Sequence, residues 1–120
     1  MNNYKDLQVW KKAFDLSANV YQITKELPKE EIFGMTSQMR RCAVSIVSNI
    51  AEGHGRGSNK DFSRFLKISI GSCNELETQV LLSEKLNYIK QPESLELQEE
   101  CKEIMKMLNG LIKKLWTVNC

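Results

Sequence analysis

The sequence predicts an all-α protein, an antiparallel up-down-up-down four-helix bundle that forms one domain over residues 1–120. Two observations predict it. Prolines and glycines divide the chain into four segments of helical length, and apolar residues recur every three or four positions within each segment. No stretch shows the sustained alternation of a strand. With 120 residues, of which 42% are hydrophobic and 27% charged, the chain has room for one core and an ordinary globular composition.

The first predicted helix covers about residues 6–26 and carries two apolar stripes. The inner stripe is Val9, Ala13, Leu16, Val20, Ile23 and Leu27, and the second stripe is Leu7, Trp10, Phe14, Ser17, Tyr21 and Thr24. A small bundle needs one apolar side of each helix for its core. The second stripe therefore predicts that the chain associates with other copies of itself.

The second predicted helix covers about residues 35–53. Its core stripe is Met35, Met39, Cys42, Ile46 and Ile50, and its opposite stripe is Gln38, Arg41, Ser45, Ser48 and Glu52. The run Gly53-His54-Gly55-Arg56-Gly57 follows, and it has two interpretations. It is either a tight turn that needs a positive φ, which we prefer, or a contact for an isolated phosphate before the next helix.

The third predicted helix covers about residues 59–88, with Ser58 or Asn59 as its N-cap. Its core stripe is Phe62, Leu66, Ile70, Cys73, Leu76 and Val80, and Gly71 in its middle suggests a close helix crossing. The fourth covers about residues 93–117, with Pro92 in the turn before it. Its core stripe is Leu97, Cys101, Ile104, Leu108, Leu111 and Leu115.

The sequence contains no motif that indicates a metal or cofactor site. The cysteines (Cys42, Cys73, Cys101 and Cys120) form no C-x-x-C pair, and His54 is the only histidine. Zinc and di-iron sites both need clustered ligands, so we expect buried reduced thiols for the first three cysteines and an exposed terminal one. No paired acid and base or nucleophile motif appears either. We therefore predict a protein that is not an enzyme and has no metal or cofactor.

Positive charge is concentrated in the middle of a nearly neutral chain. The net charge is +2, whereas residues 35–67 hold six basic side chains against two acidic ones, a local charge of +4. The six are Arg40, Arg41, Arg56, Lys60, Arg64 and Lys67. They form either a surface for nucleic-acid phosphates or a set of ion pairs within the fold. Arg40 lies nearer the core edge, where Glu52, Glu75 or Glu77 are candidate partners.

The N-terminus lacks the basic and apolar regions of a signal peptide, and no segment reaches the roughly 20 apolar residues that cross a membrane. These features predict a cytoplasmic protein without a membrane partner.

Three segments together resemble one bacterial family. Residues 38–57 read Q-M-R-R-C-A-V-S-I-V-S-N-I-A-E-G-H-G-R-G, residues 4–13 contain L-Q-V-W, and residues 61–79 read D-F-S-R-F-L-K-I-S-I-G-S-C-N-E-L-E-T-Q. They are similar to the four-helix-bundle proteins encoded by intervening sequences in 23S rRNA genes, also called S23 ribosomal proteins. Val47 stands where that pattern has proline, which leaves open whether the second helix is kinked.

The resemblance implies a homo-oligomer, a ring of five copies, and kinship with the accessory proteins of diversity-generating retroelements. Those proteins assist a reverse transcriptase and carry a basic surface that faces nucleic acid. Two hypotheses follow. In the first, the six basic residues bind structured RNA, DNA or an RNA–DNA hybrid, or an enzyme that acts on nucleic acid. In the second, the oligomer is a scaffold for a protein partner, bound through the glutamates that begin the fourth helix or through exposed apolar surface, and the arginines are structural.

Overall fold

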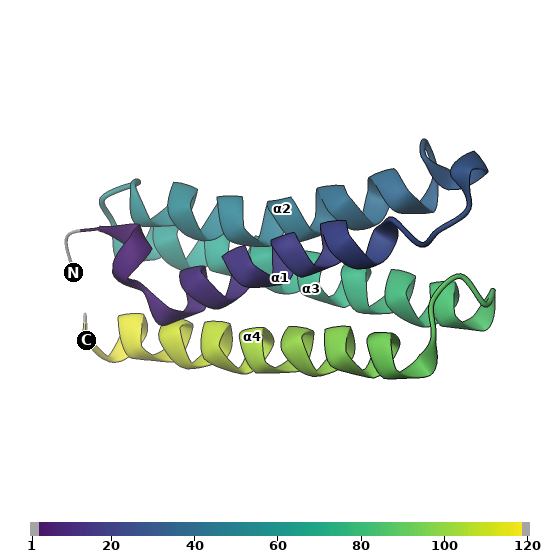
Figure 1. The fold of residues 1–120 in the computed structure, drawn as a ribbon. Coiled ribbons are helices and arrows are strands. Elements are labelled where there is room, and N and C mark those ends of the chain that lie inside the picture. The colour runs from purple at the N-terminus through teal and green to yellow at the C-terminus, as the bar shows by residue number, and fades with distance from the viewer. Residues whose placement is uncertain (1–2, 119–120) are drawn as a thin grey trace.

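A computed structural model of the chain describes residues 3–118, and all four predicted helices are present (Figure 1). They are α1 (Gln8–Thr24), α2 (Met35–His54), α3 (Asn59–Lys85) and α4 (Gln91–Val118), with two short 3-10 helices, η1 (Tyr4–Asp6) and η2 (Lys29–Glu31). The part of the chain that the structure describes contains no strand, as predicted. It also contains no helix that is long and apolar enough to cross a membrane.

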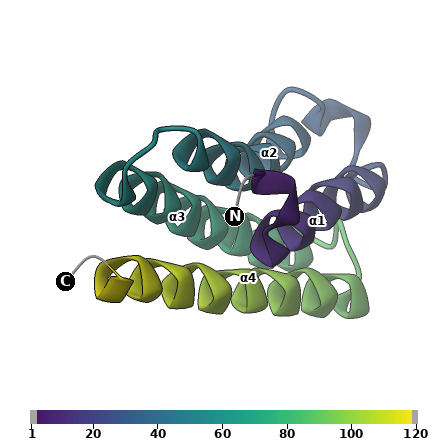
Figure 2. The same cartoon turned by 90° about the vertical axis from the view of Figure 1, so that its left-hand side faces the viewer.

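The helices form the predicted antiparallel bundle. Each helix packs against the next along the chain and α1 also packs against α4, whereas the backbones of the diagonal pairs lie farther apart. Figure 2 shows the arrangement from the end where both termini lie, with α2 and α4 on opposite sides. The bundle is elongated, 49 × 22 × 20 Å. The α2–α3 turn lies at the same end as the termini, and the α1–α2 and α3–α4 loops lie at the other.

Four predicted helix boundaries were wrong by two or three residues, and one of them is the end of the first helix, at Thr24 instead of residue 26. The first helix begins at Gln8, because residues 4–6 form η1, in which the Asn3 side chain accepts a hydrogen bond from the Lys5 amide at 2.9 Å. The third ends at Lys85, because the chain reverses at Asn87 with a φ of 61°. The fourth begins at Gln91, so Pro92 lies inside its first turn. Amide hydrogens in the first turn form no hydrogen bond within the helix, so proline, which has none, is tolerated there.

The predicted core stripes are largely confirmed. Every residue of the inner stripe of α1 is buried, as are most of those predicted for α2, α3 and α4. Met35, Ile70, Leu111 and Leu115 are only half-buried and pack on the edge of the core. α2 runs unbroken through Val47, so nothing interrupts the helix at the position where the family pattern has proline.

Part of the second stripe of α1 is covered within the monomer, contrary to prediction. Ser17 donates a hydrogen bond to the carbonyl oxygen of Ala43 at 3.0 Å, and Thr24 is buried against α2. A four-helix monomer therefore does cover part of this stripe. Its outer edge remains open, because Phe14 is 54% exposed and Tyr21 is exposed beside it.

The close helix crossing lies at Gly53 rather than at Gly71. A Cβ added at Gly53 would lie 2.6 Å from Cβ of Phe65 and 3.0 Å from Cδ1 of Phe62, whereas one at Gly71 would meet nothing within 4 Å. Ser69 donates a hydrogen bond to the carbonyl oxygen of Ile46 at 2.8 Å across the same interface. Small side chains thus bring α2 and α3 together over most of their length.

The three described cysteines are buried free thiols, as predicted. Burial raises the pKa of Cys42 to about 11 and that of Cys73 to about 12, and it raises the pKa of Cys101 as well, so all three stay protonated at neutral pH. Within residues 3–118, no group of three or more histidine, cysteine or acidic side chains is arranged to hold a metal ion. The prediction for Cys120 lies outside the described residues.

Candidate nucleic-acid interface

The six basic residues predicted from the sequence fall into two groups. Arg56, Lys60, Arg64 and Lys67 lie at and after the α2–α3 turn, near the end of the bundle that carries the termini. Arg40 and Arg41 lie in the first half of α2. Because an α-helix rises about 1.5 Å per residue, roughly 20 Å separates Arg41 from the end of α2. The six therefore do not form one compact patch.

The turn group is built around one aromatic ring. The guanidinium groups of Arg56 and Arg64 stack on Phe65, with their central carbons 4.8 and 4.6 Å from its ring centroid. Phe65 is itself nearly buried, so it holds both cations at the surface in fixed positions. This stacking aligns two positive charges, one from the α2–α3 turn and one from α3, on one edge of the bundle.

Two acidic residues partly balance these arginines. Arg56 pairs with Glu52 at 3.0 Å, and Arg64 pairs with Asp61 at 3.9 Å. All four side chains are about half exposed, and exposed pairs of this kind contribute only about 0–1 kcal/mol. Both arginines can therefore exchange a carboxylate for a phosphate at small cost.

The two lysines of the turn group are unpaired. Lys60, Arg64 and Lys67 follow the four-and-three spacing of one helix face, and all three side chains are exposed. Among residues 3–118, neither Lys60 nor Lys67 forms an ion pair within 4.0 Å. Their charges are fully available to an anionic partner. We refer to Arg56, Lys60, Arg64 and Lys67 as the basic edge.

Arg40 has a structural role, but the partners predicted for it were wrong. It is half-buried, its Nε donates a hydrogen bond to Oγ1 of Thr24 at 2.9 Å, and its guanidinium lies 4.7 Å from the ring centroid of Tyr21. It joins α2 to α1 and pairs with no acid among the described residues. The predicted glutamate partners lie on α2 and α3, whereas the Arg40 side chain points toward α1.

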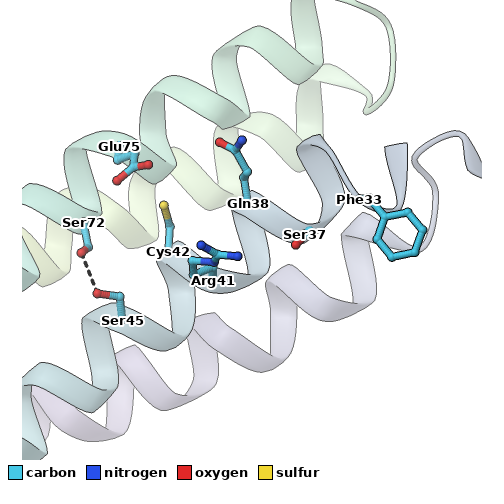
Figure 3. A pocket seen from close by; sticks show the side chains of 8 residues that line it. All are labelled: Phe33, Ser37, Gln38, Arg41, Cys42, Ser45, Ser72 and Glu75. Carbon is cyan, nitrogen blue, oxygen red and sulfur yellow. Dashed lines mark hydrogen bonds between the residues drawn. The ribbon is translucent and has the colours of Figure 1, made fainter. Parts of the chain in front are cut away.

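Arg41, the next residue, points outward. It lines a groove of about 400 Å³ between α2 and α3, together with Gln38, Glu75 and three serines (Figure 3). No ion pair of Arg41 within 4.0 Å occurs in residues 3–118. Sequence analysis distinguished the two arginines correctly by stripe, with Arg40 toward the core and Arg41 toward the solvent.

The Gly-rich run behaves as a turn. Gly57 adopts a φ of 85°, which meets the predicted need for positive φ. Oγ of Ser58 accepts a hydrogen bond from the Asp61 amide at 3.2 Å, so a side chain already caps the start of α3. His54 is not a solvated turn residue. It ends α2 and packs edge-to-face on Phe62, with 5.7 Å between ring centroids.

Two aromatic residues next to the cations were not singled out from the sequence. Phe65 lay outside the core stripe predicted for the third helix, and its position next to Arg64 was the available signal. Phe33 lies in the α1–α2 loop, is 95% exposed and lines the same groove as Arg41. Its position between a charged segment and Gly34 was the one available signal, because a core aromatic seldom occurs in such a loop.

The fold and this surface define a class: a small antiparallel four-helix bundle with a basic edge on the α2–α3 turn and α3. Residues 5–110 match the family described as 23S rRNA-intervening sequence protein. The chain belongs to this family, as its resemblance at three segments indicated.

One solved structure supports the assignment. It is the crystal structure of a protein with unknown function from the S23 ribosomal protein family of Bacteroides thetaiotaomicron. It is 28% identical to this chain with a TM-score of 0.81, and the match covers 88% of this chain and 98% of that one. No curated protein matches the sequence.

Proposed function

We propose that this protein is a non-enzymatic nucleic-acid-binding bundle that holds structured RNA, DNA or an RNA–DNA hybrid through the phosphates. The observation that carries the proposal is the basic edge, where two arginines stack on Phe65 and two lysines form no ion pair with any residue that the structure describes. Contacts of this kind neutralise phosphates and carry little sequence information. Arg41 extends the surface along α2, whereas Arg40 serves the fold.

We propose further that the protein acts as a homo-oligomer, a ring of five copies as the family resemblance implies. The support is the open outer edge of α1, where Trp10 and Phe14 stack at 4.9 Å and Tyr21 and Val44 are exposed nearby. Several basic edges on one assembly would bind a long nucleic acid more tightly than a single copy, because the later contacts are intramolecular.

Charge reversal of the unpaired lysines tests the nucleic-acid proposal. Lys60→Glu/Lys67→Glu breaks no ion pair, so the fold should stay intact while affinity for a labelled RNA hairpin falls roughly tenfold or more at low salt. The matched control is Lys102→Glu/Lys106→Glu, which makes the same charge change at exposed positions of α4. Fluorescence anisotropy gives both affinities.

Equal losses in the two double variants would show that only net charge matters and would remove the basic edge as a site. Wild-type protein that binds no nucleic acid would favour the scaffold instead, with a protein partner such as a reverse transcriptase. The glutamates of α4 are partly engaged within the fold, since Asn19 donates hydrogen bonds to Glu96 at 2.9 Å and to Glu100 at 2.7 Å.

A further inference from the structure

Phe33 is the most exposed large apolar side chain among residues 3–118, at 95%. A single exposed apolar residue is common and needs no explanation alone. Phe33 differs because its surroundings are both rigid and charged. Those two properties indicate what its ring is placed to contact.

The loop that carries Phe33 is held at several points. The amide of Gly34 donates to the carbonyl oxygen of Glu31 at 2.9 Å, and the Glu31 carboxylate accepts from the Met35 amide at 2.9 Å and from the Tyr88 hydroxyl at 2.8 Å. These bonds tie the loop to the start of α2 and to the α3–α4 loop. The backbone that carries the ring is therefore held in place, and only the Phe33 side chain has to be ordered when a partner binds.

Grooves lie on both sides of Phe33, and Arg41 lines both. One groove of about 400 Å³ runs between α2 and α3, and another of about 430 Å³ lies between α1 and α2 beside Tyr21 and Arg40. Figure 3 shows Arg41 and Gln38 on α2 between Phe33 and the hydrogen bond that joins Ser45 to Ser72. An aromatic face and an unpaired guanidinium thus stand within one site.

The lining of the first groove excludes an apolar occupant. Besides Phe33 and Cys42 it is polar: Ser37, Gln38, Arg41, Ser45, Ser72 and Glu75. An apolar segment seated there would bury the guanidinium and the carboxylate without partners, which is costly. The occupant must offer a flat π-face for Phe33, a negative group for Arg41 and hydrogen-bonding edges for the amide of Gln38.

We propose that Phe33 and Arg41 form a site for one unpaired nucleotide of a bound nucleic acid. The base stacks on the Phe33 ring and the adjoining phosphate pairs with Arg41. Glu75, across the groove, repels a phosphate there and so keeps the phosphate at Arg41. A paired base has both faces covered by its neighbours and cannot stack on the ring, so the site distinguishes bulged or single-stranded segments from continuous duplex.

This site deepens the proposed function and rests on it. Arg41 lies on the same α2 stripe as Ser45, Ser48 and Glu52, and that stripe leads toward Arg56 at the basic edge. A strand held by its phosphates at the basic edge can therefore extend along α2 to Phe33. The basic edge supplies general affinity, and Phe33 supplies the preference for unpaired bases.

The test compares two blunt-ended RNA duplexes, one fully paired and one with a single bulged nucleotide, by fluorescence anisotropy at fixed salt. Wild-type protein should bind the bulged duplex more tightly. Phe33→Ala should weaken binding of the bulged duplex by about 5- to 100-fold, and that of the paired duplex less than about twofold. Phe33→Tyr keeps a stacking ring and should retain the preference. Arg41→Gln should lower the slope of log affinity against log salt by about 1.

Each result decides between the two proposals. If the wild type binds RNA and Phe33→Ala leaves both affinities unchanged, the nucleotide site is wrong and the proposed function stands. If the wild type binds neither duplex at low salt, the proposed function fails and the site with it. If Phe33→Ala changes the mass measured by light scattering but not the preference, the ring serves assembly and the nucleotide site is again wrong.

Discussion

At the scale of single residues, Arg40 and Arg41 show how neighbours of the same type take opposite roles. Successive helix positions lie about 100° apart, so one side chain reaches α1 and the other reaches solvent. Arg40 contacts Thr24 and Tyr21, whereas Arg41 has no ion pair in residues 3–118. Arg40 therefore stabilises the fold, and Arg41 is available to bind a partner.

Alanine substitutions separate these roles. Arg40→Ala should lower the free energy of unfolding by about 1–2 kcal/mol, because it removes a hydrogen bond and a stacked cation. Arg41→Ala should stay within about 0.5 kcal/mol of wild type, as exposed substitutions usually do. Urea unfolding followed by circular dichroism measures both. A comparable loss in the two variants would contradict the division.

Gly53 and Gly71 offer a second matched pair. Gly53→Ala should lower the free energy of unfolding by about 1–3 kcal/mol, because the new Cβ would lie 2.6 Å from Cβ of Phe65 and force α2 and α3 apart. Gly71→Ala should raise it by about 0.5–1 kcal/mol, since the Cβ meets nothing within 4 Å and alanine is the better helix former. The same urea experiment compares them. A stabilised Gly53→Ala would rule out the close crossing.

The glycine error shows a limit of sequence reasoning at this scale. A glycine inside a helical pattern either allows a second helix to approach closely or is tolerated at a cost in stability. The sequence does not show which residues lie opposite the glycine, so it cannot distinguish the two cases. Gly53 seemed to belong to the turn because four residues of turn character follow it. Only the packing of Phe62 and Phe65 shows that it is the crossing point.

At the scale of elements, the two loops at the end of the bundle opposite the termini depend on Glu31. Its carboxylate caps the start of α2 and binds Tyr88 after α3. These two hydrogen bonds favour the charged form and hold the pKa of Glu31 below its usual value of 4.5. The loops are therefore joined by a group whose protonation would release them.

This coupling predicts a pH-dependent contribution to stability. A lowered folded-state pKa stabilises the fold above the unfolded value near 4.5, and the contribution is lost as the pH falls through the folded value. The difference in unfolding free energy between wild type and Glu31→Gln should be largest near neutral pH and shrink in acid. A difference that persists unchanged to about pH 3 would contradict the assignment.

Helices were more predictable than their ends. The apolar stripes of α1 to α4 could be predicted from the spacing of apolar residues alone, because the helix face that packs in the core must be apolar. The ends depend on single contacts, such as the side chain of Asn3 at η1 and the positive φ of Asn87 after α3. Neither contact is visible in the pattern of apolar residues. The six basic residues were predictable as a concentration of charge, but their division into two groups required the helix lengths and directions.

At the scale of the whole molecule, the open edge of α1 predicts an assembly. Phe14→Asp places a charge on the exposed aromatic strip formed with Trp10 and Tyr21 and should convert the oligomer to a folded monomer. Leu95→Asp, at an equally exposed position of α4, is the matched control and should leave the mass unchanged. Light scattering after gel filtration gives the mass. A wild-type protein that is already monomeric would contradict the assembly.

The central claim is that the basic edge binds nucleic acid through phosphates, and a salt titration tests it most directly. Binding of a short DNA duplex, which engages one basic edge, should weaken linearly in log salt. If all four cations contact phosphates, the slope is about −3.6, and Lys60→Glu/Lys67→Glu should reduce it to about −1.8 or less in magnitude. Tight binding with no salt dependence, or no binding at low salt by protein of confirmed mass, would contradict the account.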